Sequence, residues 1–526
     1  DVWMKEVFAN FMADKVSSVT LPDGNYDLKF LTDHYSAAYS IDRTAGAHPI
    51  RQHLDNLNEA GSLYGNIIYH KAPIVMRQLE RVMGPDAFRD GLRDYLKAYA
   101  GGNADWPDLI GMLQRHTSVN LTAWNDVWVN GTGRPRITYE LIAANGRIKD
   151  FILRQQGEDG RRHPWPQSFE LALVYKDRIE KATVMLGIPE YHLSNIFANK
   201  EVPECILLNS DGAGYGTFAV DKHSLAWLFG NSTGPAAPTA LMRASAYINV
   251  YENMLAGHDL TPRELLAYDR RMLAREPEEL DLNILLEQVN SIFWRFVPAA
   301  ARDSIAPGLE ADCWQALQQV SSDNEKKLLF RAYTNIVLSR EGQERLYVIW
   351  KSRQPPPGVK LAEEDYTGLA AALALRNYPG YAAILEAQGG RIQNKDRIER
   401  WRFLQPSLSA DIAVRDSFFA TLKNATARRK EAWVLSALGY LHHPLRTAAS
   451  EKYLAPSLDW LEDIQRTGDV FFPQSWLQAS FSYYQSPAAA TLVRHFLQTH
   501  AGYNAKLKAK ILQATDNLFR AEKLTQ

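Results

Sequence analysis

Apolar residues recur at helical spacing from the first positions of the chain. Trp3, Val7, Phe8, Phe11 and Met12 fall on one face of a helix. The pattern predicts an amphipathic helix that begins close to residue 1, without the polar residues usual at a mature terminus. We therefore expect further residues upstream of Asp1.

Helical patterns continue to about residue 136. One stretch spans residues 62–83 and ends at Gly84-Pro85, and a second continues to Gly101-Gly102. A third begins at Leu109, and a tryptophan-rich segment spans residues 121–129. We expect this first region to be helical throughout.

From Ile137 the apolar positions alternate with polar ones, which is typical of half-buried strands. Asn145-Gly146 is a hairpin dipeptide between two such stretches, and residues 169–175 alternate in the same way. The glycines around Asp211 are followed by no helical pattern, so they favour a β-turn over a nucleotide-binding loop. The sequence predicts a β-sandwich over residues 137–230.

A turn-rich linker, residues 231–238, separates this region from a long helical one. Apolar residues then recur at helical spacing with short connections, and the prolines of residues 354–358 mark a break between helices. Pairs of helices stacked as an irregular solenoid would produce this pattern.

The composition is that of an ordinary soluble globular protein, with 46% apolar residues, 23% charged residues and a net charge of −1 over 526 residues. Nothing in this balance favours nucleic acid or a membrane surface as a partner, and no apolar stretch is long enough to span a bilayer. Cys205 and Cys313 give neither a disulfide framework nor a metal-binding spacing, and we expect both to be buried free thiols.

Candidate chemistry begins with Glu6, in the run W-M-K-E-V-F-A-N-F. A glutamate in an amphipathic helix is usually a surface carboxylate. This run, however, resembles the W-L-x-E-G-F-A segment of the aminopeptidase N-type (gluzincin) zinc metallopeptidases, which implies that Glu6 is a zinc ligand. In that family two histidines and the catalytic glutamate come from an H-E-x-x-H helix, about eighteen residues earlier. The present sequence contains no H-E-x-x-H.

A second motif, I-I-Y-H-K, resembles the family's I-x-Y-x-K-G segment. The resemblance implies that Tyr69 stabilises the oxyanion formed during peptide hydrolysis. Without this resemblance, we would expect Tyr69 to be an ordinary half-buried tyrosine on a helix. We expect Tyr64, Asn10 and Lys71 to contribute to the substrate pocket.

Neighbouring positions qualify this resemblance. His70 has no partner at metal-binding spacing and is expected at the surface. Val7 and Ala72 stand where the family usually has glycine, and we expect them to reshape the pocket.

The resemblance also implies a fold that is mainly α with a β-sandwich insert. Residues 1–136 would form the α-helical half of a thermolysin-like catalytic domain, and residues 137–230 the β-sandwich. Residues 231–526 would form a C-terminal α-superhelical domain of the HEAT or armadillo kind.

The function implied is that of the C-terminal portion of a zinc-dependent aminopeptidase, with zinc as cofactor of the intact protein and peptides as substrates. The chain alone, lacking two ligands and the base, is expected to bind zinc weakly and to be inactive. Two alternatives remain, a non-catalytic helical scaffold or peptide-binding module and an epoxide-hydrolase-like relative. The preferred residue, the oligomeric state and the compartment stay open.

Overall fold

The computed structural model describes the chain except for residues 2, 22–23, 54–63, 231–236, 259 and 526. Most of the predicted linker and the start of the helical stretch predicted at residue 62 lie outside the described residues. The chain divides into two compact units, Asp1–Leu260 and Thr261–Gln526, each described by itself. No helix among the described residues is both long enough and apolar enough to cross a membrane.

Helices of the first unit bury aromatic residues against one another. In α1, Trp3 packs on Trp106 with ring centroids 4.8 Å apart, and Phe11 meets Phe88 edge-on at 5.8 Å. The predicted apolar face is therefore largely buried, although Met12 at its end is 40% exposed. The helices of this unit are α1 (Trp3–Thr20), α2 (Tyr26–Asp42), the π-helical turn η2 (Ile67–Lys71), α3 (Ala72–Met83), α4 (Pro85–Ala98), α5 (Trp106–Leu113), the 3₁₀ turn η3 (Gln114–His116), α6 (Leu121–Trp128), α7 (Ser194–Phe197), α8 (Lys222–Gly230) and α9 (Ala240–Leu255).

The alternating segment forms two sheets, with strand orders β5-β2-β1-β7 and β4-β3-β6. All pairings are antiparallel except that of β1 with β7. Asn145 and Gly146 both have positive φ, 54° and 71°, so the predicted hairpin turn between β1 and β2 is confirmed. The strands are β1 (Pro135–Ala144), β2 (Arg147–Gly157), β3 (Gln167–Val174), β4 (Ile179–Leu186), β5 (Glu190–His192), β6 (Cys205–Leu207) and β7 (Thr217–Phe218).

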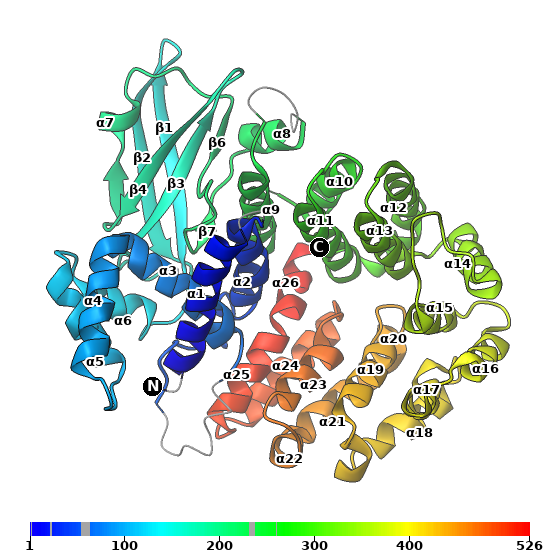
Figure 1. Cartoon of the computed structure of the whole chain (residues 1–526). Coiled ribbons are helices and arrows are strands. Elements are labelled where there is room, and N and C mark those ends of the chain that lie inside the picture. Colours follow the sequence, from blue (N-terminus) through cyan, green and yellow to red (C-terminus); the bar gives the residue numbers. More distant parts are fainter. Residues whose placement is uncertain (2, 22–23, 54–63, 231–236, 259, 526) are drawn as a thin grey trace. The chain divides into compact units, whose positions relative to one another are not determined.

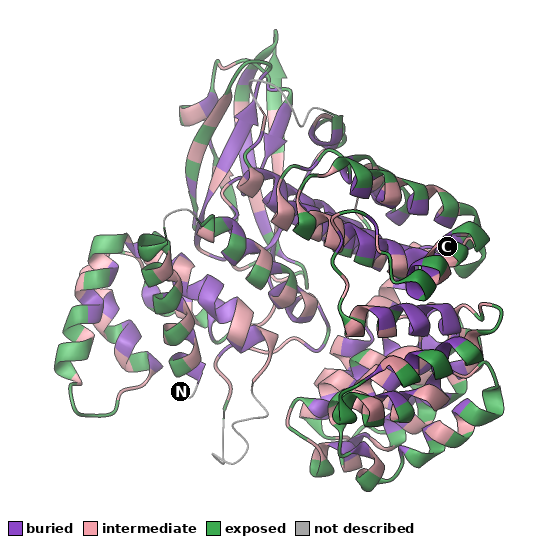
Figure 2. Ribbon diagram, turned by 45° about the vertical axis from the view of Figure 1, so that its right-hand side comes forward, coloured by how far each residue is buried: buried purple, intermediate pink, exposed green. Residues whose placement is uncertain are grey.

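One hydrophobic core joins the two sheets. Phe151 and Leu153 of β2 lie in the same buried cluster as Phe169 and Leu171 of β3. Figure 2 shows buried positions along the strands and an exposed tip where the β1–β2 hairpin turns. The sheets therefore pack face to face, as the alternating pattern predicted.

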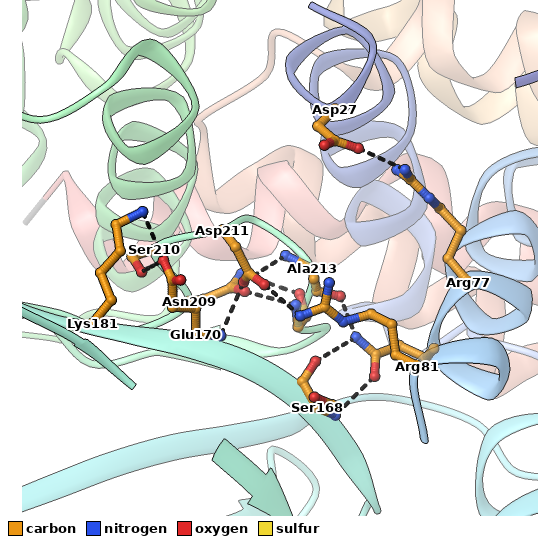
Figure 3. A network of polar contacts seen from close by, with 12 residues as sticks. Asp27, Arg77, Arg81, Ser168, Glu170, Lys181, Asn209, Ser210, Asp211 and Ala213 are labelled. Carbon is orange, nitrogen blue, oxygen red and sulfur yellow. Dashed lines mark hydrogen bonds and ion pairs between the residues drawn. The ribbon is translucent and has the colours of Figure 1, made fainter. Parts of the chain in front are cut away.

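Helix α3 is fixed to this sandwich by polar contacts (Figure 3). Gln78 is buried, and its side chain both donates to the carbonyl of Ser168 and accepts from its N–H, each at 2.9 Å. Arg81 pairs with Asp211 at 2.5 Å, and the other oxygen of Asp211 accepts the Glu170 N–H. The glycine-rich passage around Asp211 is thus a turn that anchors a helix.

Helix α9 belongs to the first unit, although the sequence placed it in the third region from residue 231. It packs against α2 and β7. Glu252 is buried and pairs with Arg43 at 2.9 Å and with Arg134 at 2.7 Å. Because both arginines belong to the first unit, the compact boundary falls at Leu260.

The second unit is entirely helical in its described residues (Figure 1). Helices pack on their sequence neighbours, as α12 does on α13, and also on the next but one, as α13 does on α15. Stacked helical pairs have such contacts, and the HEAT-like superhelix stays a prediction. The elements are α10 (Pro262–Met272), α11 (Glu279–Ser291), η4 (Ile292–Phe296), α12 (Ala299–Gln319), α13 (Asp323–Ile336), α14 (Arg340–Ser352), α15 (Glu363–Leu375), α16 (Tyr381–Arg391), α17 (Lys395–Leu408), α18 (Ile412–Thr421), η5 (Ala425–Arg428), α19 (Glu431–Leu441), α20 (Thr447–Ser450), η6 (Glu451–Tyr453), α21 (Leu454–Asp459), α22 (Leu461–Thr467), α23 (Phe472–Phe481), α24 (Pro487–Thr499), α25 (Ala505–Ala514) and α26 (Asp516–Leu524).

The two cysteines lie in different units. Cys205 and Cys313 are both buried and free, as predicted. Burial raises the pKa of each thiol to about 12, so neither is a thiolate at neutral pH.

Candidate active site

Glu6 lies on α1, at the edge of the buried face. Its neighbours Trp3 and Val7 are buried, while the Glu6 side chain keeps 23% of its surface exposed. Its nearest ion-pair partner is the exposed Lys5, 3.4 Å away. A carboxylate held in this way is partly desolvated yet open to a ligand.

Tyr69 lies in the π-helical turn η2, a wider turn than an α-helix provides. The Ala72 N–H bonds to the Ile67 carbonyl, five residues back. The Tyr69 ring stacks on Tyr64 with centroids 5.8 Å apart and planes 27° from parallel. Among the described residues its hydroxyl has no hydrogen-bond partner, so it can donate to a ligand.

The structure brings Glu6, Tyr64 and Tyr69 into one neighbourhood. Helix α1 packs against η2. The pKa of the Tyr69 hydroxyl is raised by burial first, then by the negative charge of Glu6, and then by the neighbouring Tyr64 phenol. The Glu6 carboxylate therefore lies within electrostatic range of the phenol. A raised pKa keeps the phenol protonated at neutral pH, as a hydrogen-bond donor must be.

Two further predicted residues differ in their surroundings. Asn10 is half-buried, one turn beyond Glu6 on the same helix. Lys71 is completely buried, and its Nζ lies 2.8 Å from Asp42 Oδ2 and 3.1 Å from the Gly133 carbonyl. Because its ammonium is ion-paired and hydrogen-bonded in the protein interior, we assign Lys71 to the anchoring of η2 and not to the substrate pocket.

The counterion of Lys71 is itself held on several sides. Asp42 Oδ1 accepts the Gly133 N–H at 3.0 Å, and Asp42 Oδ2 accepts the Tyr215 hydroxyl at 3.1 Å. The Lys71 ammonium also lies 5.5 Å from the centre of the Tyr215 ring. These contacts join η2 to the C-terminal end of α2 and to the segment that precedes β1.

A pair of histidines holds the other side of η2. Pro73 has no N–H, so the Tyr69 carbonyl, four residues earlier, lacks its usual helical donor. The His34 ring lies near the Tyr69 backbone and the His70 ring near the Asp33 backbone, and each backbone group favours the protonated form of its ring. The two Nδ1 atoms lie 3.1 Å apart.

Burial explains the electrostatics of this pair. It lowers the pKa of His34 to about 4, with the nearby His70 and Arg77 acting in the same direction and Asp33 opposing them. The pKa of His70 is also lowered by burial. The sequence placed His70 at the surface, but it is half-buried because α2 supplies a partner ring.

Sequence reasoning missed Asp42, His34 and Tyr215. Each is far from η2 along the chain. Asp42 and His34 belong to no short motif, and Tyr215 lies in the glycine-rich passage around Asp211, in which the sequence predicted only a turn. The available signal was Pro73, since a proline in a helix leaves a carbonyl that another side chain must satisfy.

The described residues contain no group of three or more His, Cys, Asp or Glu side chains that could hold a metal ion. Glu6 fits the part of a single ligand, because its carboxylate is partly buried and has only an exposed lysine as partner. A complete zinc site requires further ligands.

Comparisons with known proteins agree with these features. Residues 1–128 match the peptidase family M1 domain. Aminopeptidase N of Streptomyces lividans is 26% identical over 332 residues, covering 58% of this chain and 37% of the relative. Puromycin-sensitive aminopeptidase of Caenorhabditis elegans is 29% identical over 191 residues, covering 35% and 20%. Leucyl aminopeptidase of Saccharolobus solfataricus is 29% identical over 137 residues, covering 26% and 18%.

The helical first region is thus similar to the peptidase family M1 domain. These matches support the predicted resemblance to the aminopeptidase N-type family. The chain spans 37% or less of the length of these three relatives.

Proposed function

We propose that this chain supplies part of the active site of a zinc-dependent aminopeptidase that removes N-terminal residues from peptides. The observation that supports the proposal is the packing of α1, which carries Glu6, against η2, which carries Tyr69, with an electrostatic effect of Glu6 on the Tyr69 pKa. Both residues lie in motifs that resemble those of the family. The names of the relatives support the same class of reaction.

In this proposal Glu6 is one zinc ligand, and the zinc, when bound, supplies an activated water and polarises the scissile carbonyl. The sequence contains no H-E-x-x-H. In this proposal the two imidazoles and the general base are supplied by residues other than these 526.

Tyr69 donates a hydrogen bond from its hydroxyl to the carbonyl oxygen as negative charge develops there. The phenol suits this role because its raised pKa keeps it protonated. Stacking on Tyr64 fixes the ring before substrate arrives, so little reorganisation is needed. One such donor contributes about 3–4 kcal/mol to transition-state stabilisation.

The test uses a longer protein that joins these residues to an H-E-x-x-H segment. We expect hydrolysis of aminoacyl anilides and stoichiometric zinc by elemental analysis. Tyr69→Phe should lower kcat by about 10²–10³-fold and leave zinc content unchanged, whereas Glu6→Gln should reduce zinc content. Tyr95→Phe, in α4, is the matched control and should keep wild-type turnover.

Wild-type turnover in Tyr69→Phe would remove this residue from the mechanism. The 526-residue chain alone should bind zinc weakly and show no turnover, because its described residues offer no complete metal site. Stoichiometric zinc together with turnover in that chain would contradict the proposal.

A further inference from the structure

A cavity of about 520 Å³ opens in the second unit, lined by residues of α11, η4, α13, α15 and α19. Small residues of α15, including Gly368, Ala371 and Ala372, leave its centre open. Trp294 and Phe330 line it as apolar walls. This volume lies within the range of small-molecule sites, about 300–1,000 Å³.

The carboxylates at the rim of this cavity already have cationic partners. Asp365 pairs with Lys327 at 3.5 Å, and Glu364 pairs with Arg397 at 3.4 Å. Arg331 also lines the cavity, is exposed, and forms no ion pair within the described part of the chain. The rim therefore carries a positive charge that no carboxylate neutralises.

A second guanidinium, that of Arg376, also lines the cavity. It donates to the carbonyls of Thr334 at 3.0 Å, Asn335 at 2.8 Å and Ala372 at 2.9 Å. Burial lowers its pKa to about 10, and Glu310 is the one nearby carboxylate that opposes this shift. Arg376 is thus satisfied in hydrogen bonds but forms no ion pair with any described residue.

Two more arginines lie behind the cavity. Arg302 donates to the Trp294 carbonyl at 2.8 Å, and Arg446 donates to the Ser407 carbonyl at 2.6 Å. Both are buried, neither has a carboxylate partner among the described residues, and burial lowers the pKa of each to about 10. The carbonyls at a helix C-terminus together supply only about half a unit of negative charge.

The positive charge of these arginines affects the pKa of His443. Burial lowers its pKa to about 3, and Arg376, Arg446 and Arg302 all act in the same direction. Its Nδ1 accepts the Leu445 N–H at 3.3 Å, which leaves the proton of the neutral ring on Nε2. His443 lines the cavity, so it adds a neutral donor beside the guanidinium groups.

We infer that this cavity binds a small organic anion, through a carboxylate or phosphate group held by Arg331 and His443 in the field of the Arg376 charge. Positive groups in a partly desolvated cavity without full counterions are stabilised by an anion. The Arg331 guanidinium can bind either group in two-point geometry. The N–H groups of Arg376 are largely taken by carbonyls, so Arg376 contributes its charge. The apolar walls, Trp294 and Phe330, favour an aromatic or aliphatic body on the ligand.

The test uses isothermal titration calorimetry on the 526-residue chain with three probes. N-acetyl-L-phenylalanine carries the carboxylate, phenyl phosphate carries the phosphate, and N-acetyl-L-phenylalanine amide carries neither. We expect at least one anionic probe to bind at least tenfold more tightly than the amide, and the tighter of the two identifies the preferred group. Equal affinity for the amide, or no binding of either anion, would overturn the inference.

Two pairs of variants locate the site. Arg331→Ala should weaken the bound anion at least fivefold, while Arg402→Ala, which removes an exposed arginine outside the cavity, should not. A Cβ added at Gly368 or at Gly390 meets no heavy atom within 4 Å, and both glycines are exposed on helices. Gly368→Leu should fill the cavity and abolish binding, and Gly390→Leu should leave it intact.

If the anion binds equally well to Arg331→Ala and Gly368→Leu, the inference is wrong. The measurement needs neither zinc nor turnover. Its outcome is therefore independent of the proposed aminopeptidase function.

Discussion

Replacing Asp42 by asparagine should destabilise the first unit more than any surface substitution. The side chains of Asp42 and Lys71 both have no exposed surface and form an ion pair at 2.8 Å. The asparagine keeps the shape but removes the charge, which leaves a buried ammonium without a counterion. Breaking a buried pair in this way costs about 3–5 kcal/mol in the free energy of unfolding.

A double variant separates this effect from a simple loss of packing. Asp42→Asn with Lys71→Met contains no uncompensated charge, and replacing both members of a buried pair is often neutral. The double variant should therefore be more stable than Asp42→Asn alone. The surface pair of Asp86 and Arg89 is the control, and Asp86→Asn should cause no measurable change.

The assay is urea denaturation followed by hydrogen exchange and mass spectrometry. Peptides from α2 and α3 report the first unit, so unfolding of the second unit does not enter the result. The reasoning is refuted if Asp42→Asn loses less than about 1 kcal/mol, well under the range expected for a broken buried pair. Lys71→Met alone completes the cycle, and the reasoning is equally refuted if the losses of the two single variants simply add in the double variant.

Three more predictions follow from the first unit. The folded pKa of His34, about 4, lies below its usual 6.5, so protonation on unfolding should lower the stability of wild type as the pH falls from 6.5 to 4. His34→Gln should flatten that slope in thermal unfolding, and an unchanged slope would contradict the assignment. Asp105 caps α5 by accepting the Asp108 N–H at 3.1 Å. Asp105→Ala should therefore lower the free energy of unfolding by about 1 kcal/mol in urea denaturation. An unchanged free energy of unfolding would contradict the role of the cap. Glu6→Gln should lower the pKa of the Tyr69 hydroxyl, because one of the negative charges that raise it is removed; spectroscopic titration that finds the same or a higher pKa would contradict their proximity.

Local rules predicted much of the fold. The alternation from Ile137 and the Asn145-Gly146 turn correspond to β1, β2 and their connection, because side-chain period and positive φ are properties of a few adjacent residues. The helix boundary at Gly84 follows for the same reason, since its φ of 88° ends α3. The placement of α9 depended on distant contacts, such as Glu252 with Arg43, and the pattern of residues carried no sign of it.

The candidate site divides in the same way. Glu6 and Tyr69 could be picked out because each lies in a short motif that resembles the family's. The sequence alone determined these two residue types, the helices that carry them and the alternating strands that follow. Only the tertiary structure decided that Lys71 is buried against Asp42, that His34 meets His70, and that separate helices gather arginines around one cavity. A partner that is distant in sequence leaves no periodicity, and its effect on charge and burial exists only once the chain has folded.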